Sequence, residues 1–272
     1  VLPDGFEGAI DRFSQFFIAP LFTAEYTERE VNAVNSEHQK NVMNDNWRYF
    51  RVSSLFAKEG HPSRKFGTGS LETIGDITRE ELVSFYEQHY SSNRMGLALL
   101  SSHSLDDLEV WAKKYFTTIK NRKLKRNYHD PVLYDKKETL RLVKIDPVKD
   151  IRNLQIIYPI PGTREMYENK PGRQLGFIIG HEGEGSLLSY LKNKGWALSL
   201  SAGAGSDTKE YGMATIKIGL TPKGLEEYRE VVKTTLNYIE LMKTSGYQTH
   251  VYNELKSMAE LEYVYGSKGE GM

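Results

Sequence analysis

Residues 28–38 read Glu28-Arg29-Glu30-Val31-Asn32-Ala33-Val34-Asn35-Ser36-Glu37-His38, a charged stretch without glycine or proline. Val31, Val34 and Val42 recur at helical spacing and punctuate the charged residues. The run Asn44-Asp45-Asn46 then breaks the pattern. We therefore predict a helix over residues 27–44.

Two carboxylates share one face of this predicted helix. Glu30 and Glu37 are seven positions apart, which places their Cα atoms roughly 10 Å apart along the axis. One can bind a metal ion while the other orients it, and a solvated charged helix is the alternative. His38 points about 100° away from Glu37, so we expect it at the surface or supporting a ligand rather than binding the metal itself.

Composition narrows the function classes. Lysine plus arginine and aspartate plus glutamate both number 36 in 272 residues, so no net field favours nucleic acid or an anionic membrane as partner. The absence of cysteine excludes disulfides, thiolate zinc sites and a cysteine nucleophile. No apolar run reaches the roughly 18 residues that a membrane span needs. We expect a soluble, cytoplasmic protein.

Local signals predict an α+β chain. In the first part we expect helices over residues 6–17, 79–90 and 104–116, the second opened by a capping box at Thr78 and the third capped by Ser104, with a strand over 94–100. In the second part we expect strands over 140–145, 153–158 and 213–220, two helices between 172 and 194, and a long helix after Thr221-Pro222.

Several other sequence features do not support phosphate binding or serine-based hydrolysis. The basic run at residues 120–126 lacks interleaved aromatic residues and is interpreted as linker. Phe66-Gly67-Thr68-Gly69 lacks the Lys-Ser/Thr pair of a phosphate-binding loop. No Gly-x-Ser-x-Gly elbow is present for serine hydrolysis.

Residues 29–45 resemble the second metal-binding segment of the insulinase/pitrilysin family of inverzincin zinc metallopeptidases. Further collinear segments also resemble that family: His61-Pro62 with Lys65-Phe66-Gly67-Thr68-Gly69, Tyr90-Ser91-Ser92-Asn93, Ser104-Leu105-Asp106-Asp107-Leu108, Lys149-Asp150-Ile151-Arg152-Asn153-Leu154, Ile179-Gly180-His181-Glu182-Gly183 and Gly185-Ser186-Leu187-Leu188. Matches in order over nearly the whole chain are more specific than any one short motif.

The resemblance implies a zinc endopeptidase in which His-x-x-Glu-His supplies two ligands and the general base. By position, Glu37 is the third zinc ligand and Glu30 its support. None of the seven histidines forms His-x-x-Glu-His, and the motif belongs upstream of Val1. We therefore expect this chain to be an internal piece of a longer peptidase, inactive alone, with Zn²⁺ bound weakly or not at all.

The family also implies an arrangement of mixed β-sheets flanked by helices in two successive units. Residues 1–116 are expected to form the C-terminal part of a first, zinc-bearing peptidase domain, 117–137 a linker, and 138–272 the N-terminal part of a second. Implied partners are peptide substrates such as peptide hormones, the rest of the parent chain and, as the family often dimerises, a second copy. A truncated homologue that binds peptides without cutting them is the alternative.

The resemblance further suggests substrate-binding residues. Trp47 and Phe50 match aromatic residues that border the catalytic cleft, with core packing as the alternative. A second site, which holds the substrate's N-terminal segment, matches Arg173, Gly176, Gly180 and Glu182 on a helix and Leu200, Ser201 and Ala202 on a neighbouring strand.

An exposed strand edge can pair with any extended peptide, and Glu182 can accept its α-ammonium. Arg173 and Phe177 stand where the family more usually has histidine. A flexible Gly/Ala loop with a helix-capping glutamate is the alternative.

Overall fold

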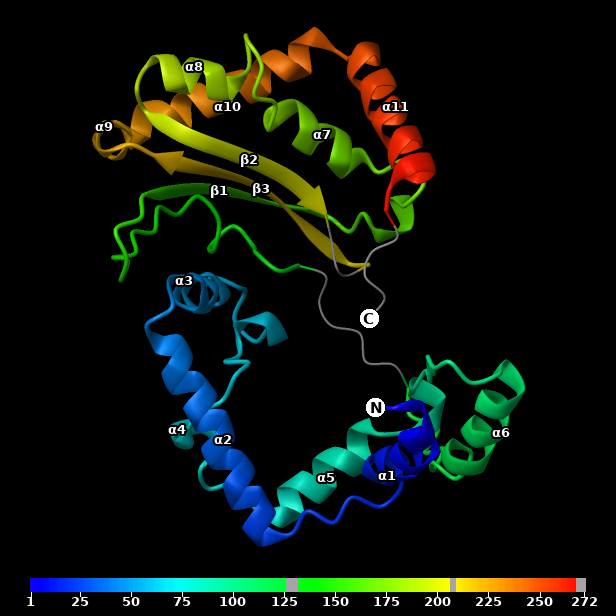
Figure 1. Cartoon of the computed structure of the whole chain (residues 1–272). Coiled ribbons are helices and arrows are strands. Elements are labelled where there is room, and N and C mark those ends of the chain that lie inside the picture. Colours follow the sequence, from blue (N-terminus) through cyan, green and yellow to red (C-terminus); the bar gives the residue numbers. More distant parts are fainter. Residues whose placement is uncertain (126–131, 206–208, 268–272) are drawn as a thin grey trace. The chain divides into compact units, whose positions relative to one another are not determined.

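A computed structural model describes residues 1–125, 132–205 and 209–267 (Figure 1). The chain divides into two compact units, one made of Val1–Leu55 and Lys65–His129, the other of Phe56–Arg64 and Asp130–Met272. Part of the predicted linker, residues 126–131, lies outside the described residues. The assignment of peptidase domains to residues 1–116 and 138–272 stays a prediction.

The regular secondary structure described in the first unit is helical, and loops connect the helices. Its α-helices are α1 (Phe6–Ile18), α2 (Ala24–Val42), α3 (Asp45–Ser54), α4 (Leu71–Ile74), α5 (Arg79–His89) and α6 (Leu105–Phe116), with short 3-10 turns at Pro3–Gly5 and Ser92–Arg94. The predicted caps are confirmed. Thr78 and Glu81 form the capping box of α5, and the Ser104 hydroxyl accepts the backbone N–H of Asp107 at 3.1 Å to begin α6.

The predicted strand over residues 94–100 is wrong. Met95 has extended backbone angles, φ −109° and ψ 147°, but no described segment pairs with it. An extended segment becomes a strand only through hydrogen bonds to a neighbour, and the described part of the first unit supplies none.

The second unit is built on an antiparallel sheet. Its strands are β1 (Asn153–Pro161), β2 (Ala197–Gly205) and β3 (Tyr211–Leu220), in the order β1-β3-β2. Ile216 of β3 pairs with Ile156 on one side and Ala202 on the other. The unit's helices are α7 (Pro171–Ile179), α8 (Leu187–Asn193), α9 (Pro222–Glu226), α10 (Tyr228–Ser245) and α11 (Thr249–Tyr265), with 3-10 turns at Pro62–Arg64 and Arg164–Met166.

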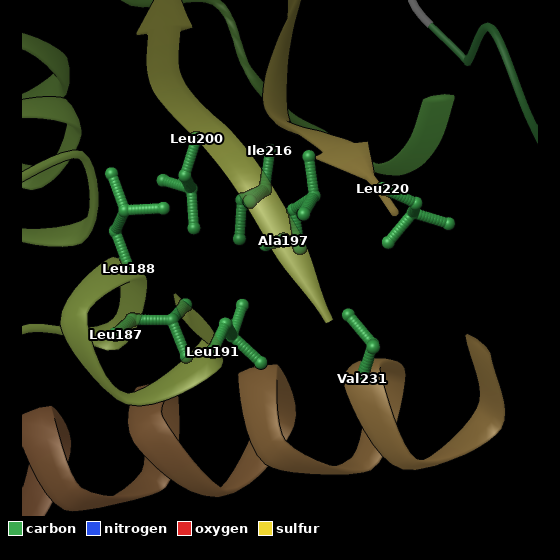
Figure 2. Close-up of a cluster of buried hydrophobic side chains, with 9 residues drawn as sticks. Leu187, Leu188, Leu191, Ala197, Leu200, Ile216, Leu220 and Val231 are labelled. Carbon is green, nitrogen blue, oxygen red and sulfur yellow. The ribbon is translucent and has the colours of Figure 1, made fainter. Parts of the chain in front are cut away.

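The core of this unit lies between the sheet and its helices. Alternate residues of β3 face inward, so Ile216, Ile218 and Leu220 are buried while Lys217 is exposed. They meet the leucines of α8 and Val231 of α10 (Figure 2). The full cluster comprises Leu187, Leu188, Leu191, Ala197, Leu200, Ile216, Ile218, Leu220 and Val231. This core fixes β2 in place and leaves its outer edge for α7.

Two expectations in this unit need correction. Residues 140–145 form no strand, because Leu140 adopts a left-handed φ of 55° and no described strand pairs with the segment. Thr221 caps a helix as predicted, but the predicted single long helix is divided at Glu227 into α9 and α10. The short first helix, α9, is tied to the end of α8 by the Thr221 hydroxyl, which donates to the carbonyl of Gly195 at 2.7 Å.

The α+β class is confirmed, because the chain combines helices with a small antiparallel sheet. Among the residues that the structure describes, no helix is long and apolar enough to cross a bilayer.

Candidate functional site

Helix α2 presents Glu30 and Glu37 to solvent. Val31 is buried and Val34 half-buried, on the side that packs against α4 and Gly69. Glu30 and Glu37 are both exposed, and neither carboxylate has a partner among the described residues. The amphipathic pattern therefore leaves both acids free for a group outside this chain.

His38 does not join these acids. Its ring stands edge-on to Phe66, with centroids 5.1 Å apart, on the half-buried side of the helix. This ring contact positions the imidazole against Phe66.

Trp47 and Phe50 lie together on α3, the helix after α2. Their rings form an edge-to-face pair with centroids 6.2 Å apart, and both side chains are exposed. The Asn44 side chain caps α3 by accepting the N–H groups of Asn46 and Trp47. Core packing, the alternative for these aromatics, is not what the described residues show.

A cavity of about 430 Å³ opens in the second unit. Three separated stretches of sequence line it: the end of α7 with the turn that follows, the middle of β2, and one side of α11. The lining residues are Gly176, Phe177, Gly180, His181, Glu182, Leu200, Ser201, Ala202, Glu254 and Met258. Six of these, all except Phe177, His181, Glu254 and Met258, were predicted to bind substrate.

Glycines on α7 allow it to approach β2 closely. A Cβ placed on Gly172 would lie 2.0 Å from the carbonyl oxygen of Ala204, and one on Gly176 would lie 2.8 Å from that of Ala202. The spacing of four residues puts both glycines on the same side of the helix. Because β2 ends the strand order, one of its edges is unpaired by any described strand, and α7 lies beside it (Figure 1).

Glu182 lies in a turn and not on the helix, which corrects the expected placement. Helix α7 ends at Ile179, and Gly180 is its C-cap, with its N–H donated to the carbonyl of Gly176 at 2.9 Å. His181 Nδ1 then accepts the N–H of Gly183 at 3.1 Å and stabilises the turn. Glycine loses more conformational entropy in a helix than other residues do, so this glycine-rich segment favours a turn. The turn brings His181 and Glu182 to the cavity.

Arg173 is absent from the lining of this cavity as the structure describes it. Its Nη2 instead lies 4.0 Å from Glu262 Oε2 of α11. Helix α11 also contributes Glu254 and Met258, which sequence reasoning missed. The signal that was available is their spacing, because residues 254, 258 and 262 fall on one side of a helix.

Residues 76–258 match the family model described as the peptidase M16 inactive domain, and residues 1–59 match insulinase (peptidase family M16). The first match alone spans more than half of the 272 residues.

The chain belongs to peptidase family M16. This M16 chain is 37% identical over 269 residues to the A-factor-processing enzyme of Saccharomyces cerevisiae, covering 96% of the chain and 26% of the relative. It is 39% identical over 275 residues to an insulin-degrading enzyme of Drosophila melanogaster, covering 98% and 28%. The crystal structure of pitrilysin matches all of it with a TM-score of 0.89 at 26% identity, over 30% of that structure.

The M16 chain thus spans between a quarter and a third of these relatives. The residues that the structure describes do not form a complete zinc site. A catalytic zinc takes three protein ligands and a water, whereas the described residues contain no group of three histidine, cysteine or acidic side chains placed to hold a metal. Helix α2 contributes two exposed carboxylates on one face, Glu30 and Glu37.

Proposed function

We propose that this M16 chain is the part of a zinc metalloendopeptidase that supplies one zinc ligand and an anchor for the N-terminal segment of the peptide substrate. Glu37 is the ligand and Glu30 orients it. The cavity between α7, β2 and α11 is the anchor. The other two ligands and the general base belong to residues outside this chain.

The observation that carries the proposal is the convergence at the cavity. Gly176, Gly180 and Glu182 come from one stretch of sequence, and Leu200 to Ala202 come from a strand some twenty residues later. Despite that separation they line a single space of about 430 Å³, large enough for several peptide atoms but far too small for a folded protein.

The geometry suits an extended peptide. The part of β2 that lines the cavity, Leu200–Ala202, offers backbone groups with which an extended peptide can pair without requiring a particular side chain. Glu182 adds a carboxylate to the same lining, with which a free α-ammonium can pair. A peptide held in this way binds by its N-terminal segment.

Substrates, assembly and location follow from the family resemblance. We propose short peptides such as peptide hormones as substrates, in keeping with the names of the relatives. We also propose a cytoplasmic enzyme, which the cysteine-free composition supports, and a homodimer of the whole enzyme.

A non-catalytic peptide-binding subunit is the second candidate function. It is favoured by the match of residues 76–258 to a domain described as inactive. Both candidates need the cavity, and they differ in whether Glu37 contributes to a zinc site in the longer protein.

Amide hydrogen exchange of the chain tests the anchor. A free-amine peptide at saturating concentration is expected to slow exchange at Leu200–Ala202 and in the turn at residues 180–182. Amides of α10, which does not line the cavity, serve as the internal control and are expected to keep their rates. Unchanged exchange in β2 with bound peptide would place the binding elsewhere and defeat the proposal.

A further inference from the structure

One side of helix α11 lines the cavity and contributes an acidic residue to it. Glu254, Met258 and Glu262 follow one another at intervals of four residues, so they lie along one side of the helix. Glu254 and Met258 line the cavity, and Glu262 pairs with Arg173 of α7. This side of α11 therefore faces α7 and the cavity together.

Two carboxylates line the same cavity without a counter-ion. Neither Glu182 nor Glu254 forms a hydrogen bond or ion pair with any residue that the structure describes. None of the described lining residues is a lysine or arginine. Other acids of α11 are paired, since Glu260 lies 3.8 Å from Lys256 and Glu262 lies 4.0 Å from Arg173.

The imidazole in the lining does not offset this charge in its neutral form. His181 Nδ1 accepts the backbone N–H of Gly183, so the single proton of a neutral ring sits on Nε2. The cavity lining therefore combines two carboxylates with apolar surface from Phe177, Leu200 and Met258.

A peptide N-terminus supplies one positive charge, which satisfies one carboxylate. The second carboxylate then favours a cationic side chain close to that terminus. The aliphatic stem of a lysine or arginine can lie against Met258 while its charged end reaches Glu254.

We propose that Glu254 is a specificity-determining residue, through which the cavity selects peptides with a lysine or arginine next to their free N-terminus. This inference rests on the proposed function of the cavity as a peptide anchor. Because Glu254 is exposed, its preference for the cation is modest, about two- to fivefold in affinity, the range of an exposed ion pair. The preference weakens as salt screens the pair.

The test compares two free-amine peptides that differ only at position 2, where one has lysine and the other has norleucine, a side chain of similar length without the charge. Affinities for the chain are measured by isothermal titration at low ionic strength. The unmutated chain is expected to bind the lysine peptide about two- to fivefold more tightly. Glu254→Gln is expected to bind both equally. The matched control, Glu260→Gln on the same helix, is expected to keep the preference.

Each other outcome counts against the inference. Equal affinity of the unmutated chain for the two peptides, or a lysine preference that survives Glu254→Gln, overturns the role of Glu254 and leaves the anchor itself standing. Failure of both peptides to bind overturns the anchor as well. A lysine preference lost equally in Glu260→Gln shows a general effect of helix charge and also overturns the assignment.

Discussion

Gly172 lies so close to Ala204 that a methyl group on its Cα would come within 2.0 Å of the Ala204 carbonyl oxygen. No side-chain rotation relieves that contact, because the position of a Cβ is fixed by its own backbone and the carbonyl oxygen belongs to the backbone of β2. The absence of a side chain at Gly172 thus sets the distance between α7 and β2. That distance determines whether the turn after α7 brings Glu182 to the cavity.

Gly172→Ala is therefore expected to destabilise the chain by about 1–3 kcal/mol, the usual cost of overpacking. The sign is informative, because alanine within a helix is otherwise more stable than glycine. Gly203→Ala is the matched control, since a Cβ on Gly203 meets nothing within 4 Å. Thermal unfolding followed by circular dichroism measures both variants. Equal melting temperatures for the two variants would contradict the close packing of α7 on β2.

Acid is expected to weaken the contact between α1 and α6. Glu7 Oε1 accepts hydrogen bonds from Lys114 Nζ and from the Tyr115 hydroxyl, each at 2.9 Å. The bond from Lys114, followed by that from Tyr115, lowers the pKa of Glu7 below the ordinary value of 4.5. The stabilisation is complete above that ordinary value and is lost as the pH falls through the lowered one.

Glu7→Gln should accordingly lower the melting temperature at pH 7 and have a smaller effect at pH 3. Glu28→Gln, at an exposed position of α2, is the control and should have little effect at either pH. A Glu7→Gln effect that is larger at pH 3 than at pH 7 would show that the carboxylate does not stabilise the contact.

Within the longer enzyme, Glu37→Gln and Glu30→Gln should differ in zinc content. Loss of a ligand removes stable occupancy, whereas loss of a supporting group weakens affinity by about 10- to 100-fold. Metal analysis after dialysis at low free zinc separates these cases. Glu37→Gln protein that retains one tightly bound zinc per chain would disprove the assignment.

The chain by itself is expected to show no peptidase activity with added zinc, because one carboxylate cannot replace a three-ligand site. A fluorogenic peptide assay with and without chelator measures this. Turnover that zinc supports and chelator removes would show that the chain holds a complete site after all.

Local signals predicted the helices well and the strands unevenly. The boundaries of α5 and α6 follow from Thr78 and Ser104, whose hydroxyls act within one turn of the chain. Residues 94–100 and 140–145 had strand-like sequences, but a strand depends on a partner that a local pattern does not reveal.

The candidate site was likewise predictable only in part from local sequence patterns. Glu30 and Glu37 could be placed on one helix face from spacing alone. Glu182, Leu200 and the other predicted cavity residues came from the family resemblance, since no local pattern links a turn to a strand. Glu254 was missed because its contact with the cavity depends on the packing of α11 beside α7.

The anchor is tested most directly by the affinity of the chain for one peptide with a free N-terminus and for its N-acetylated twin, in the unmutated chain and in Glu182→Gln. Our account predicts that the unmutated chain binds the free-amine peptide more tightly and that Glu182→Gln erases the difference, because the carboxylate pairs with the α-ammonium. Equal affinities for the two peptides in the unmutated chain would contradict it.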